Sequence, residues 1–434
     1  MTAGPGTRRT PFRWRSPIRG PWLTSMFALP LLVGLPVVIV TGLLDWMAYG
    51  PQFGQSIPSD VGLLRLPFFE WPADPPWLFR LTEGLHIGLG MILVPVVLAK
   101  LWSVIPKLFT GPPRGPVKAL ERLSLVLLVG GILFEIVTGL LNVQYDYVFG
   151  FSFYQAHFVG AWVFVGAFAV HVILKFPTLV RSLGSRSLAK ELRTPLSRTE
   201  PEPPDEHGLV APDPDPPTMT RRGAIGLVAG GALFVAAITA GQTLGGWLRP
   251  AALLLPRGRT TAADGSSRTP GFPPDAVPGP ENDFPVNRTF VASGIAPAAI
   301  GPMWAVTLTG GDGEVRLDYD QLNALPQHTA ELPIACVEGW STVQTWSGVR
   351  LRDLAGMAGV PEPASAVVQS VEVGPFARAQ LTSSQVLAPD SLLAVRVNGK
   401  ALSRDHGYPA RVIVPALPGV HNTKWVVGIE FRRV

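Results

Sequence analysis

Hydrophobic residues follow two patterns along the chain: long unbroken stretches up to residue 248, and short runs between turns beyond residue 286. Five of the long stretches contain the roughly 20 residues that a helix needs to cross a bilayer. They are Trp22–Leu44, Leu81–Val104, Leu120–Val143, Phe151–Phe176 and Ile225–Leu248. Because the first four follow one another closely, we predict an all-α transmembrane four-helix bundle and one further transmembrane helix.

The C-terminal pattern predicts a compact α+β domain. Strand segments are expected at residues 303–310, 313–318, 331–339, 366–374, 392–402, 410–417 and 424–433, and helices at 319–325 and 348–360. The glycine-rich residues 310–313 and the pair Asn398-Gly399 supply the turns of two hairpins. A segment of about 150 residues is ample for one hydrophobic core.

Changes in composition mark the boundaries between these parts. We assign residues 1–20 to an N-terminal tail, 21–182 to the four-helix domain, 223–248 to the fifth helix and 286–434 to the C-terminal domain. Residues 183–222 are rich in proline and acid, so they are expected to form a linker that buries no core. Residues 249–285, rich in proline and glycine, are expected to form a second linker.

Composition and charge indicate that the apolar helices lie in a membrane. Hydrophobic residues make up 47% of the chain and charged residues 15%, and the formal net charge is +5. Lysine and arginine cluster at residues 8–19, 107–122 and 181–193, whereas the loop after the first span carries Asp45, Asp60, Glu70 and Asp74. The positive-inside bias therefore predicts a multi-pass protein of the cytoplasmic membrane with a cytoplasmic N-terminus. Because its cations flank membrane spans, the chain needs no nucleic-acid partner.

The pair Arg221-Arg222 precedes the glycine- and alanine-rich fifth span. Two interpretations stay open: an internal twin-arginine export signal, or two cations that follow the positive-inside bias. Under both, the fifth helix carries the chain out of the cytoplasm. The first linker is then cytoplasmic, and the second linker and the C-terminal domain are extracytoplasmic.

Three of the seven histidines lie within the predicted spans, where an imidazole is costly unless it is paired or ligated. His86 in the second span and His157 in the fourth both lie roughly 8–10 Å from the outer ends of their helices, at about 1.5 Å per residue. Two imidazoles at one depth on different helices fit bis-histidine ligation of a haem iron. For each histidine alone, a hydrogen bond across helices is the alternative.

His171 follows His157 by 14 residues, which keeps both on similar faces of one helix. Together with His86, this spacing resembles the four-helix diheme b-type cytochromes, such as the cytochrome subunits of formate dehydrogenases and nickel hydrogenases. The resemblance implies haem b and electron exchange with the quinone pool. In that family the first helix supplies a ligand to the inner haem, but here that helix has no histidine and only Met26 as a soft ligand. We therefore expect one haem on His86 and His157, with His171 a tentative ligand of a second.

Cys336 is the only cysteine of the chain, so an intrachain disulfide framework and a multi-cysteine metal site are both excluded, and no disulfide partner is expected. Three roles stay open for the residue by itself. It could be a buried small hydrophobe, a redox nucleophile that lacks a resolving cysteine, or the one protein ligand of a soft metal.

The segments around Cys336 and His406 resemble the sulfite-oxidase fold of molybdopterin enzymes. They read IACVEGWSTVQTWSGVRLRDLAGMAGV and LSRDHGYPARVIVPALPGVHNTKWVVGIEF, and the resemblance covers about residues 282–434. It implies that Cys336 binds molybdenum and is the catalytic residue. The residues that it places at the molybdopterin are Asn287, Arg288, His406, Arg411, His421, Asn422 and Lys424.

One departure from the family selects a branch. Sulfite oxidases and plant nitrate reductases follow the cysteine with Ala-Gly-Asn-Arg, whereas this chain continues with Val337-Glu338-Gly339-Trp340-Ser341. The latter is similar to the bacterial branch that includes the protein-methionine-sulfoxide reductase catalytic subunit. The resemblances together imply an enzyme that carries electrons from quinol through haem b to molybdenum and reduces a small-molecule or protein sulfoxide. The alternatives are an oxidase of a sulfite-like substrate that feeds the quinone pool, and a non-catalytic electron-relay module.

Overall fold

The computed structural model divides into two compact units. It describes residues 15–53, 59–61, 64–108, 115–144, 153–205, 208–244, 248, 251–252, 280–286, 288–311, 313–374 and 377–433. The first unit comprises Met1–Pro36, Gly90–Ile136 and Gly160–Ala236, and the second comprises Val37–Leu89, Val137–Val159 and Ala237–Val434. The division crosses every long helix of the described residues, so the second unit holds one end of each together with the C-terminal domain.

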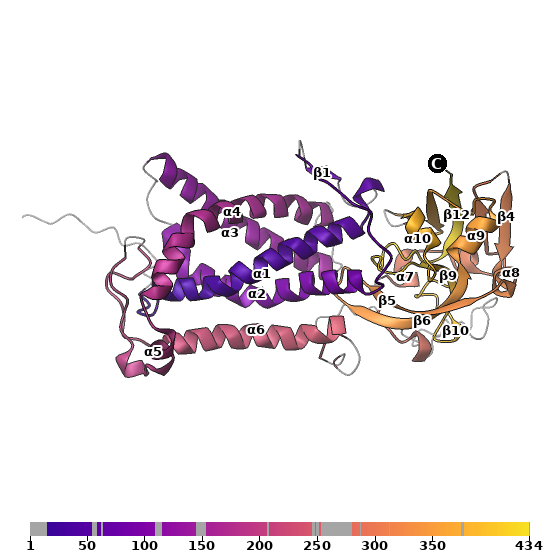
Figure 1. Cartoon of the computed structure of the whole chain (residues 1–434). Coiled ribbons are helices and arrows are strands. Elements are labelled where there is room, and N and C mark those ends of the chain that lie inside the picture. Colours follow the sequence, from indigo (N-terminus) through magenta and orange to yellow (C-terminus); the bar gives the residue numbers. More distant parts are fainter. Residues whose placement is uncertain are drawn as a thin grey trace, which may run out of the picture. The chain divides into compact units, whose positions relative to one another are not determined.

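Five long apolar helices occur among the described residues, as the hydrophobic stretches predict (Figure 1). They are α1 (Pro21–Ala48), α2 (Leu78–Leu108), α3 (Pro116–Gln144), α4 (Phe153–Gly184) and α6 (Arg221–Leu244). Each is long and apolar enough to cross a membrane. Large side chains such as Val33 and Ile173 point away from the protein, which is the favourable arrangement only where lipid surrounds the helices. These helices are consistent with a multi-pass membrane protein.

Residues 183–222 pack more closely than a linker of their composition is expected to. They form α5 (Leu188–Arg193) and the 3-10 helix η2 (Leu196–Arg198), and Leu209 is buried. Within the first unit, the Glu202 carboxylate accepts a hydrogen bond from the Trp22 backbone nitrogen over 3.0 Å. The guanidinium of Arg221, 1% exposed, lies 3.3 Å from Glu191. The expectation that this stretch buries no core is wrong, because Leu209 is buried and because Glu202 and Glu191 are buried against groups of α1 and α6.

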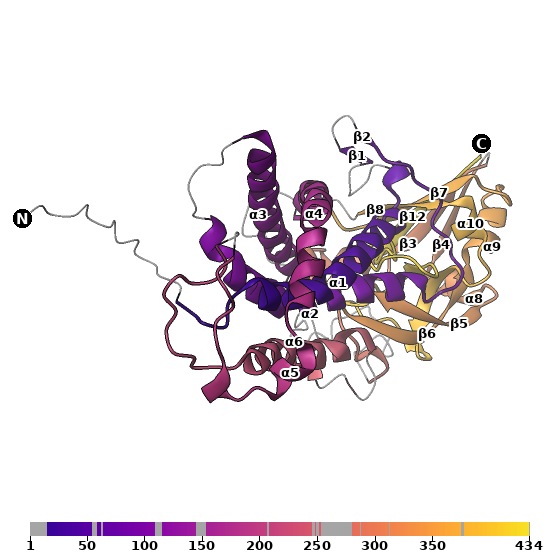
Figure 2. The same ribbon diagram turned by 60° about the vertical axis from the view of Figure 1, so that its left-hand side comes forward.

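The C-terminal domain contains two five-stranded sheets, drawn in orange and yellow in Figure 2. One has the order β10-β9-β6-β5 with β11 paired to β9, and the other has the order β4-β3-β12-β7-β8. The strands are β3 (Ala305–Thr309), β4 (Glu314–Asp318), β5 (His328–Ala335), β6 (Ser341–Arg350), β7 (Ser365–Ser370), β8 (Arg378–Thr382), β9 (Leu392–Val397), β10 (Lys400–Ala401), β11 (Arg411–Ile413) and β12 (Val426–Arg432). The pairs are antiparallel except for β12 with β3.

Short elements complete the second unit. They are β1 (Asp60–Val61), β2 (Leu64–Arg65), α7 (Phe290–Ser293), α8 (Tyr319–Ala324), α9 (Leu351–Met357), α10 (Ser383–Leu387) and the 3-10 helices η1 (Pro51–Phe53), η7 (Pro280–Asn282) and η8 (Pro297–Ile300). A capping box starts α8, where Asp318 and Gln321 each bond the other's backbone nitrogen. The α+β prediction is confirmed, and so are the β3–β4 and β9–β10 hairpins.

Two strands were not predicted, and one predicted helix is too long. β6 reads STVQTWSGVR, whose small polar residues hide a strand that is paired on both edges, with β5 and β9. Gly348 lets the β9 backbone pass so closely that a side chain there would overlap the Leu393 carbonyl. The residues before Leu351 therefore pair with β9, and only α9 remains of the helix expected at 348–360. β8 was missed as well.

Buried contacts join the ends of the long helices to the C-terminal domain within the second unit. The indole nitrogen of Trp71 donates to the Ala416 carbonyl over 2.7 Å, and its own carbonyl accepts from Gln385 over 3.2 Å. The guanidinium of Arg80 donates to the Ser341 hydroxyl over 3.0 Å. Because Trp71 is 2% exposed, these bonds are shielded from water, and they fix the segment after α1 against the domain.

The Trp71 contact gives the first testable prediction. We expect Trp71→Phe to lower the free energy of unfolding by about 1–3 kcal/mol, because the Ala416 carbonyl loses its donor in a buried site. Thermal unfolding of the detergent-solubilised chain measures this, with Phe68→Leu as the control because Phe68 is 53% exposed. Equal melting temperatures for the two variants would show that the Trp71 hydrogen bond contributes nothing.

Candidate functional site

Cys336 begins a tight loop between β5 and β6. Its backbone nitrogen donates to the Trp340 carbonyl over 2.9 Å, and the Gly339 nitrogen donates to the Cys336 carbonyl over 2.8 Å. Gly339 has a φ of +81°, which side chains other than glycine rarely adopt. The thiol is buried, and burial, with the neighbouring Glu338 carboxylate, raises its pKa well above the usual range. A protonated, enclosed thiol is a poor redox nucleophile, so the structure favours a metal ligand or a core residue.

Two cations lie in a small pocket with Cys336. Arg411 begins β11, and its guanidinium donates to the His406 and Asn422 carbonyls over 3.1 and 2.9 Å. The ammonium group of Lys424 donates to the Asp405 carbonyl over 2.9 Å. Burial lowers the pKa of Arg411 to about 9, and burial together with Arg411 lowers the pKa of Lys424 to about 7. Burial is the main cause of both shifts, and at Lys424 the neighbouring carboxylates Asp405 and Glu372 offset it only in part.

The histidines of this region are held as neutral rings. His406 stacks on Phe284 with ring centroids 3.6 Å apart, and its Nε2 lies 2.9 Å from the Asn282 carbonyl. Burial lowers the pKa of His406 far below its ordinary value and that of His421 to about 4. His421 packs edge-on against Tyr49, with centroids 5.7 Å apart. Neither histidine is placed as a cation, so they serve as hydrogen-bonding and packing groups.

The other residues at the expected cofactor site are placed unevenly. Arg288 forms an ion pair with Glu372 over 2.7 Å and lines a second pocket beside Cys336. Asn422 lines the same pocket, and its side-chain oxygen accepts from the Val414 nitrogen over 2.8 Å. Asn287 lies outside the described residues. The structure therefore brings together every described residue that the resemblance places at the cofactor, except that His421 faces Tyr49.

The chemistry of these groups fits molybdopterin. In the described part of the protein, Arg411 Nε and Asn422 Nδ2 are buried without a hydrogen-bond partner, which is costly unless an acceptor binds there. A phosphate would accept from Arg411 and Lys424 and restore their charge. The Cys336 sulfur would lose its proton on ligation to a metal.

Glu338 is a site residue that the sequence analysis did not single out. Its carboxylate is 1% exposed and accepts from the Trp340 indole nitrogen over 2.7 Å. Burial raises its pKa to about 7, so it can hold or release a proton near neutral pH. The sequence signal that could have identified Glu338 is its position two residues after Cys336, the expected metal ligand. Trp340 stands at the sequence position where sulfite oxidases have an arginine. Its indole nitrogen donates to the Glu338 carboxylate.

The other pair of expected ligands, His86 and His157, also meets within the second unit. Their ring centroids are 6.1 Å apart and the rings are perpendicular, at 89°. His86 Nδ1 lies 2.9 Å from the Val38 carbonyl, and His157 Nδ1 lies 3.0 Å from the Thr138 hydroxyl. Two imidazoles bound through nitrogen to one metal at about 2.0–2.1 Å have centroids roughly 6 Å apart. The Nδ1 bonds orient the rings as outer-shell partners of metal-bound histidines do.

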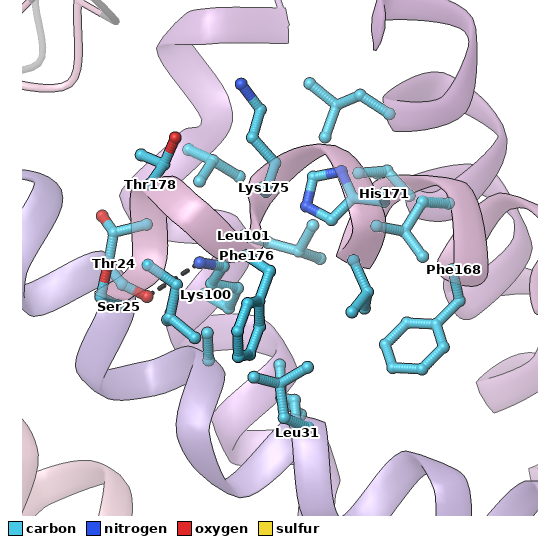
Figure 3. Close-up of a pocket in the computed structure, with 18 of the residues that line it drawn as sticks. Thr24, Ser25, Leu31, Lys100, Leu101, Phe168, His171, Lys175, Phe176 and Thr178 are labelled. Carbon is cyan, nitrogen blue, oxygen red and sulfur yellow. Dashed lines mark hydrogen bonds between the residues drawn. The ribbon is translucent and has the colours of Figure 1, made fainter. Parts of the chain in front are cut away.

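His171 lies in the first unit, in an apolar pocket of about 190 Å³ (Figure 3). Lys100, Ser25 and the Lys175–Glu121 ion pair also line this pocket. Lys100 donates a hydrogen bond to the Thr24 carbonyl over 2.8 Å. Met26 faces a different hollow, beside Ile225 and Val228. The structure therefore does not bring Met26 and His171 together, and His171 is the only histidine among the described residues of the pocket.

Comparisons with known proteins bear on the C-terminal domain. Residues 294–434 match the model of the family described as Oxidoreductase molybdopterin binding domain. An uncharacterized oxidoreductase, YuiH of Bacillus subtilis (strain 168), is 37% identical over 123 residues, which are 28% of this chain and 61% of that protein. Sulfite oxidase of Arabidopsis thaliana is 28% identical over 201 residues, covering 35% of this chain and 51% of that protein.

A solved structure, the sulfane dehydrogenase SoxCD from Paracoccus pantotrophus, is 23% identical with a TM-score of 0.28 over 30% of this chain and 38% of that one. We draw no conclusion from a likeness at that level. The chain spans between half and two thirds of the length of the two relatives described above. Its C-terminal part is a molybdopterin-binding oxidoreductase domain of the sulfite-oxidase type.

The buried cations make cofactor retention testable. We expect Arg411→Met to lower the molybdenum and pterin content per chain roughly tenfold or more, because a charged hydrogen bond contributes about 1.5–3 kcal/mol. Arg411→Lys keeps the charge but loses the planar fork, so it should retain part of the cofactor. Metal analysis and pterin fluorescence measure both variants, with Arg352→Met as the exposed control. Full cofactor content in Arg411→Met would remove this residue from the binding site.

Proposed function

We propose that the chain is a membrane-bound molybdopterin oxidoreductase that oxidises quinol in the membrane and reduces an oxygenated substrate, such as a sulfoxide, outside the cytoplasm. The balanced reaction is R₂SO + QH₂ → R₂S + Q + H₂O. The coupling between the His86–His157 pair and the Cys336 site carries the proposal. Both sites belong to one compact unit, and Ile87, next to His86, packs against Gly339, three residues after Cys336.

A haem b is the group that His86 and His157 would hold. Bound there, it would supply one-electron transfer between quinol and the molybdenum site. The chain's own contribution is orientation. Val38 and Thr138 fix the two rings through Nδ1, while Gly42 and Gly139 lie against the same rings and leave room beside them. A side chain at Gly42 would overlap His86, so this glycine keeps the ring in its present place.

At the second site, Cys336 would be the protein ligand of molybdenum, with Arg411 and Lys424 on the pterin phosphate. The molybdenum cofactor supplies two-electron oxygen-atom exchange when bound. Reduction of a sulfoxide consumes two protons for the water that leaves. Glu338, with its pKa near 7 and its side chain in the pocket beside Cys336, is suited to hold one of them.

The pocket of the first unit supports a quinol site. Its lining is apolar except for a few polar groups, as cofactor sites usually are. An ammonium group has three protons to donate, and Lys100 uses one on Thr24, so it can also donate to a quinone oxygen. His171 can accept a proton as QH₂ becomes Q with release of two electrons and two protons. We propose this role for His171 in place of a second haem.

The membrane orientation in the proposal comes from charge. The basic clusters mark the cytoplasmic ends of the helices, so the C-terminal domain lies outside the cytoplasmic membrane. An export signal at Arg221-Arg222 would carry the domain across with its cofactor. Arg221 is buried against Glu191 once the chain has folded, so its recognition as a signal has to come before that packing.

The alternative function is oxidation of a small sulfite-like substrate with electrons passed to quinone. The relative named sulfite oxidase favours it. The Glu338 carboxylate, which the Trp340 indole holds beside Cys336, disfavours sulfite oxidation. A buried carboxylate at the site repels an oxyanion. A non-catalytic relay is the remaining alternative, and turnover assays with sulfoxide and with sulfite distinguish the three.

Spectroscopy tests the membrane half. We expect about one low-spin b-type haem per chain. His86→Leu or His157→Leu should abolish the spectrum, because one imidazole cannot hold the six-coordinate iron. His171→Leu should keep most of it and lower the rate of reduction by quinol. Pyridine haemochrome analysis of the purified variants gives the haem content, and loss of haem in His171→Leu would contradict the one-haem proposal.

Turnover tests the other half. Cys336→Ser should lose sulfoxide reduction by quinol and the thiolate–molybdenum absorption, whereas quinol should still reduce the haem. The fold should persist, because serine keeps nearly the same shape and only one sulfur atom of the buried cluster around Cys336 is replaced. If Cys336 were a structural thiol, serine would bury a hydroxyl at a cost of about 1–3 kcal/mol and activity would survive. Melting temperature, molybdenum content and activity on this variant distinguish the two roles, and retained activity excludes Cys336 as the ligand.

A further inference from the structure

The Cys336 loop is covered by residues from the membrane-spanning helices of the same unit. A β-carbon at Gly339 would lie 2.9 Å from the Ile87 side chain of α2. The Ser341 hydroxyl donates to the Thr243 carbonyl of α6 over 2.7 Å and accepts from Arg80 of α2 over 3.0 Å. The loop that follows Cys336 therefore faces α2 and α6 and not solvent.

The second loop of the site is covered in the same way. Tyr49, which follows α1, packs edge-on against His421 and against Phe79 of α2, with centroid distances of 5.7 and 6.2 Å. It also packs against Tyr154 of α4 at 6.0 Å. Tyr49 is 5% exposed and Phe79 is 1% exposed, so these rings exclude water from this side of the site. The Trp71 indole covers the same loop at Ala416, whose carbonyl accepts its hydrogen bond.

The pocket that opens beside Cys336 is small and polar. It measures about 40 Å³ and is lined by Cys336, Glu338, Arg288 and Lys424 from the domain. Tyr154, at the first turn of α4, also lines it. Two positive and two negative side chains, counting Glu372, surround this space. Because Cys336, Arg288 and Lys424 would also contact the cofactor, the space left here for a substrate is smaller still and suits only a small polar molecule.

The Tyr49 hydroxyl points to a ligand. It is buried, and it has no hydrogen-bond partner among the residues that the structure describes. A buried hydroxyl is costly unless a bound group satisfies it, and the Tyr49 ring lies 6.0 Å from the ring of Tyr154, which lines the pocket beside Cys336. An oxygen atom of a small substrate beside Cys336 would accept this hydrogen bond.

From these observations we infer that the substrate is a free small molecule and not a residue of a protein, and that Tyr154 of α4 forms part of one wall of its pocket, with Tyr49 packed against it. The inference rests on the proposed function for its sulfoxide chemistry. A methionine sulfoxide within a protein brings its backbone with it. On the side of the site that α2, α6 and the segment around Trp71 cover, buried contacts with the domain leave no path for that backbone. A free sulfoxide needs only the small pocket.

A comparison of two substrates tests the inference. The full-length enzyme in detergent, reduced by a viologen dye so that the quinol site is bypassed, is assayed with free methionine sulfoxide and with a small globular protein whose surface methionines have been oxidised. We expect kcat/KM to be roughly 100-fold or more higher for free methionine sulfoxide, because the oxidised protein is too large to reach the pocket at Cys336. Values within about tenfold of each other would overturn the inference.

The two proposals fail in different ways. If neither sulfoxide is reduced but sulfite is oxidised, the direction of the proposed reaction is wrong and the small-substrate inference stands. If neither sulfoxide is reduced and sulfite is not oxidised, the proposed function fails, and the accessibility of Cys336 then decides the inference alone. That measurement needs no turnover.

Cys336 is the single cysteine, so its labelling reports access to the site without ambiguity. Full-length chain made in cells that lack the cofactor is treated with N-ethylmaleimide or with a maleimide carrying a long polyethylene glycol chain. We expect modification by the large reagent to be slower by roughly tenfold or more, with both reagents reacting fully after denaturation. Equal rates before denaturation would contradict the enclosed site.

Variants of the aromatic wall complete the test. Tyr154→Ala should speed labelling by the large reagent severalfold, because its ring lines the pocket at Cys336. Tyr49→Phe keeps the packing and removes only the hydroxyl, so labelling should stay unchanged while KM for the free sulfoxide rises. Phe68→Ala, at an exposed site, is the control for both. Unchanged labelling in Tyr154→Ala together with an unchanged KM in Tyr49→Phe would remove the membrane helices from the pocket.

Discussion

The burial of positive charge around Cys336 is the constraint on which the C-terminal domain depends. Arg411 and Lys424 both lose water on folding, and the nearby backbone carbonyls satisfy only part of their hydrogen-bonding capacity. Burial alone disfavours two neighbouring cations, as the lowered pKa values of both groups show. An anionic group of the proposed cofactor between Arg411 and Lys424 would offset this cost.

The docking of the helix ends involves residues beside both proposed redox centres. The residues that cover the Cys336 loop come from the same turns of α2 and α4 that carry the histidine pair: Ile87 adjoins His86, and Tyr154 precedes His157 by one turn. Because these neighbours belong to one compact unit, packed side chains and not a linker lie between the two proposed centres. The contacts that hold this distance constant are the same ones that restrict the substrate pocket.

Much of this architecture follows from the sequence, and the failures have identifiable causes. The five helices and the hairpins at Gly310 and Asn398 were predictable because lipid and tight turns each leave a local signature. β6 was not, since pairing on both edges replaces the alternation that marks a half-buried strand. Cys336 and Arg411 were predictable from motifs, whereas Tyr49 and Trp71 were not. Their roles arise from contacts with residues more than 300 positions away, which no local pattern records.

Residues 183–222 show how composition can mislead in the opposite direction. Proline and acid normally keep a segment from burying a core, because the carboxylates must stay hydrated. Here Glu191 and Glu202 are buried because Arg221 and the backbone of Trp22 satisfy them, so the acids that predicted a linker instead join the start of α1 to the start of α6. A buried ion pair of this kind contributes little to stability by itself, but breaking one partner leaves an unpaired charge. The Arg221–Glu191 ion pair therefore favours one arrangement of the starts of α1 and α6. That arrangement requires Arg221 to be buried.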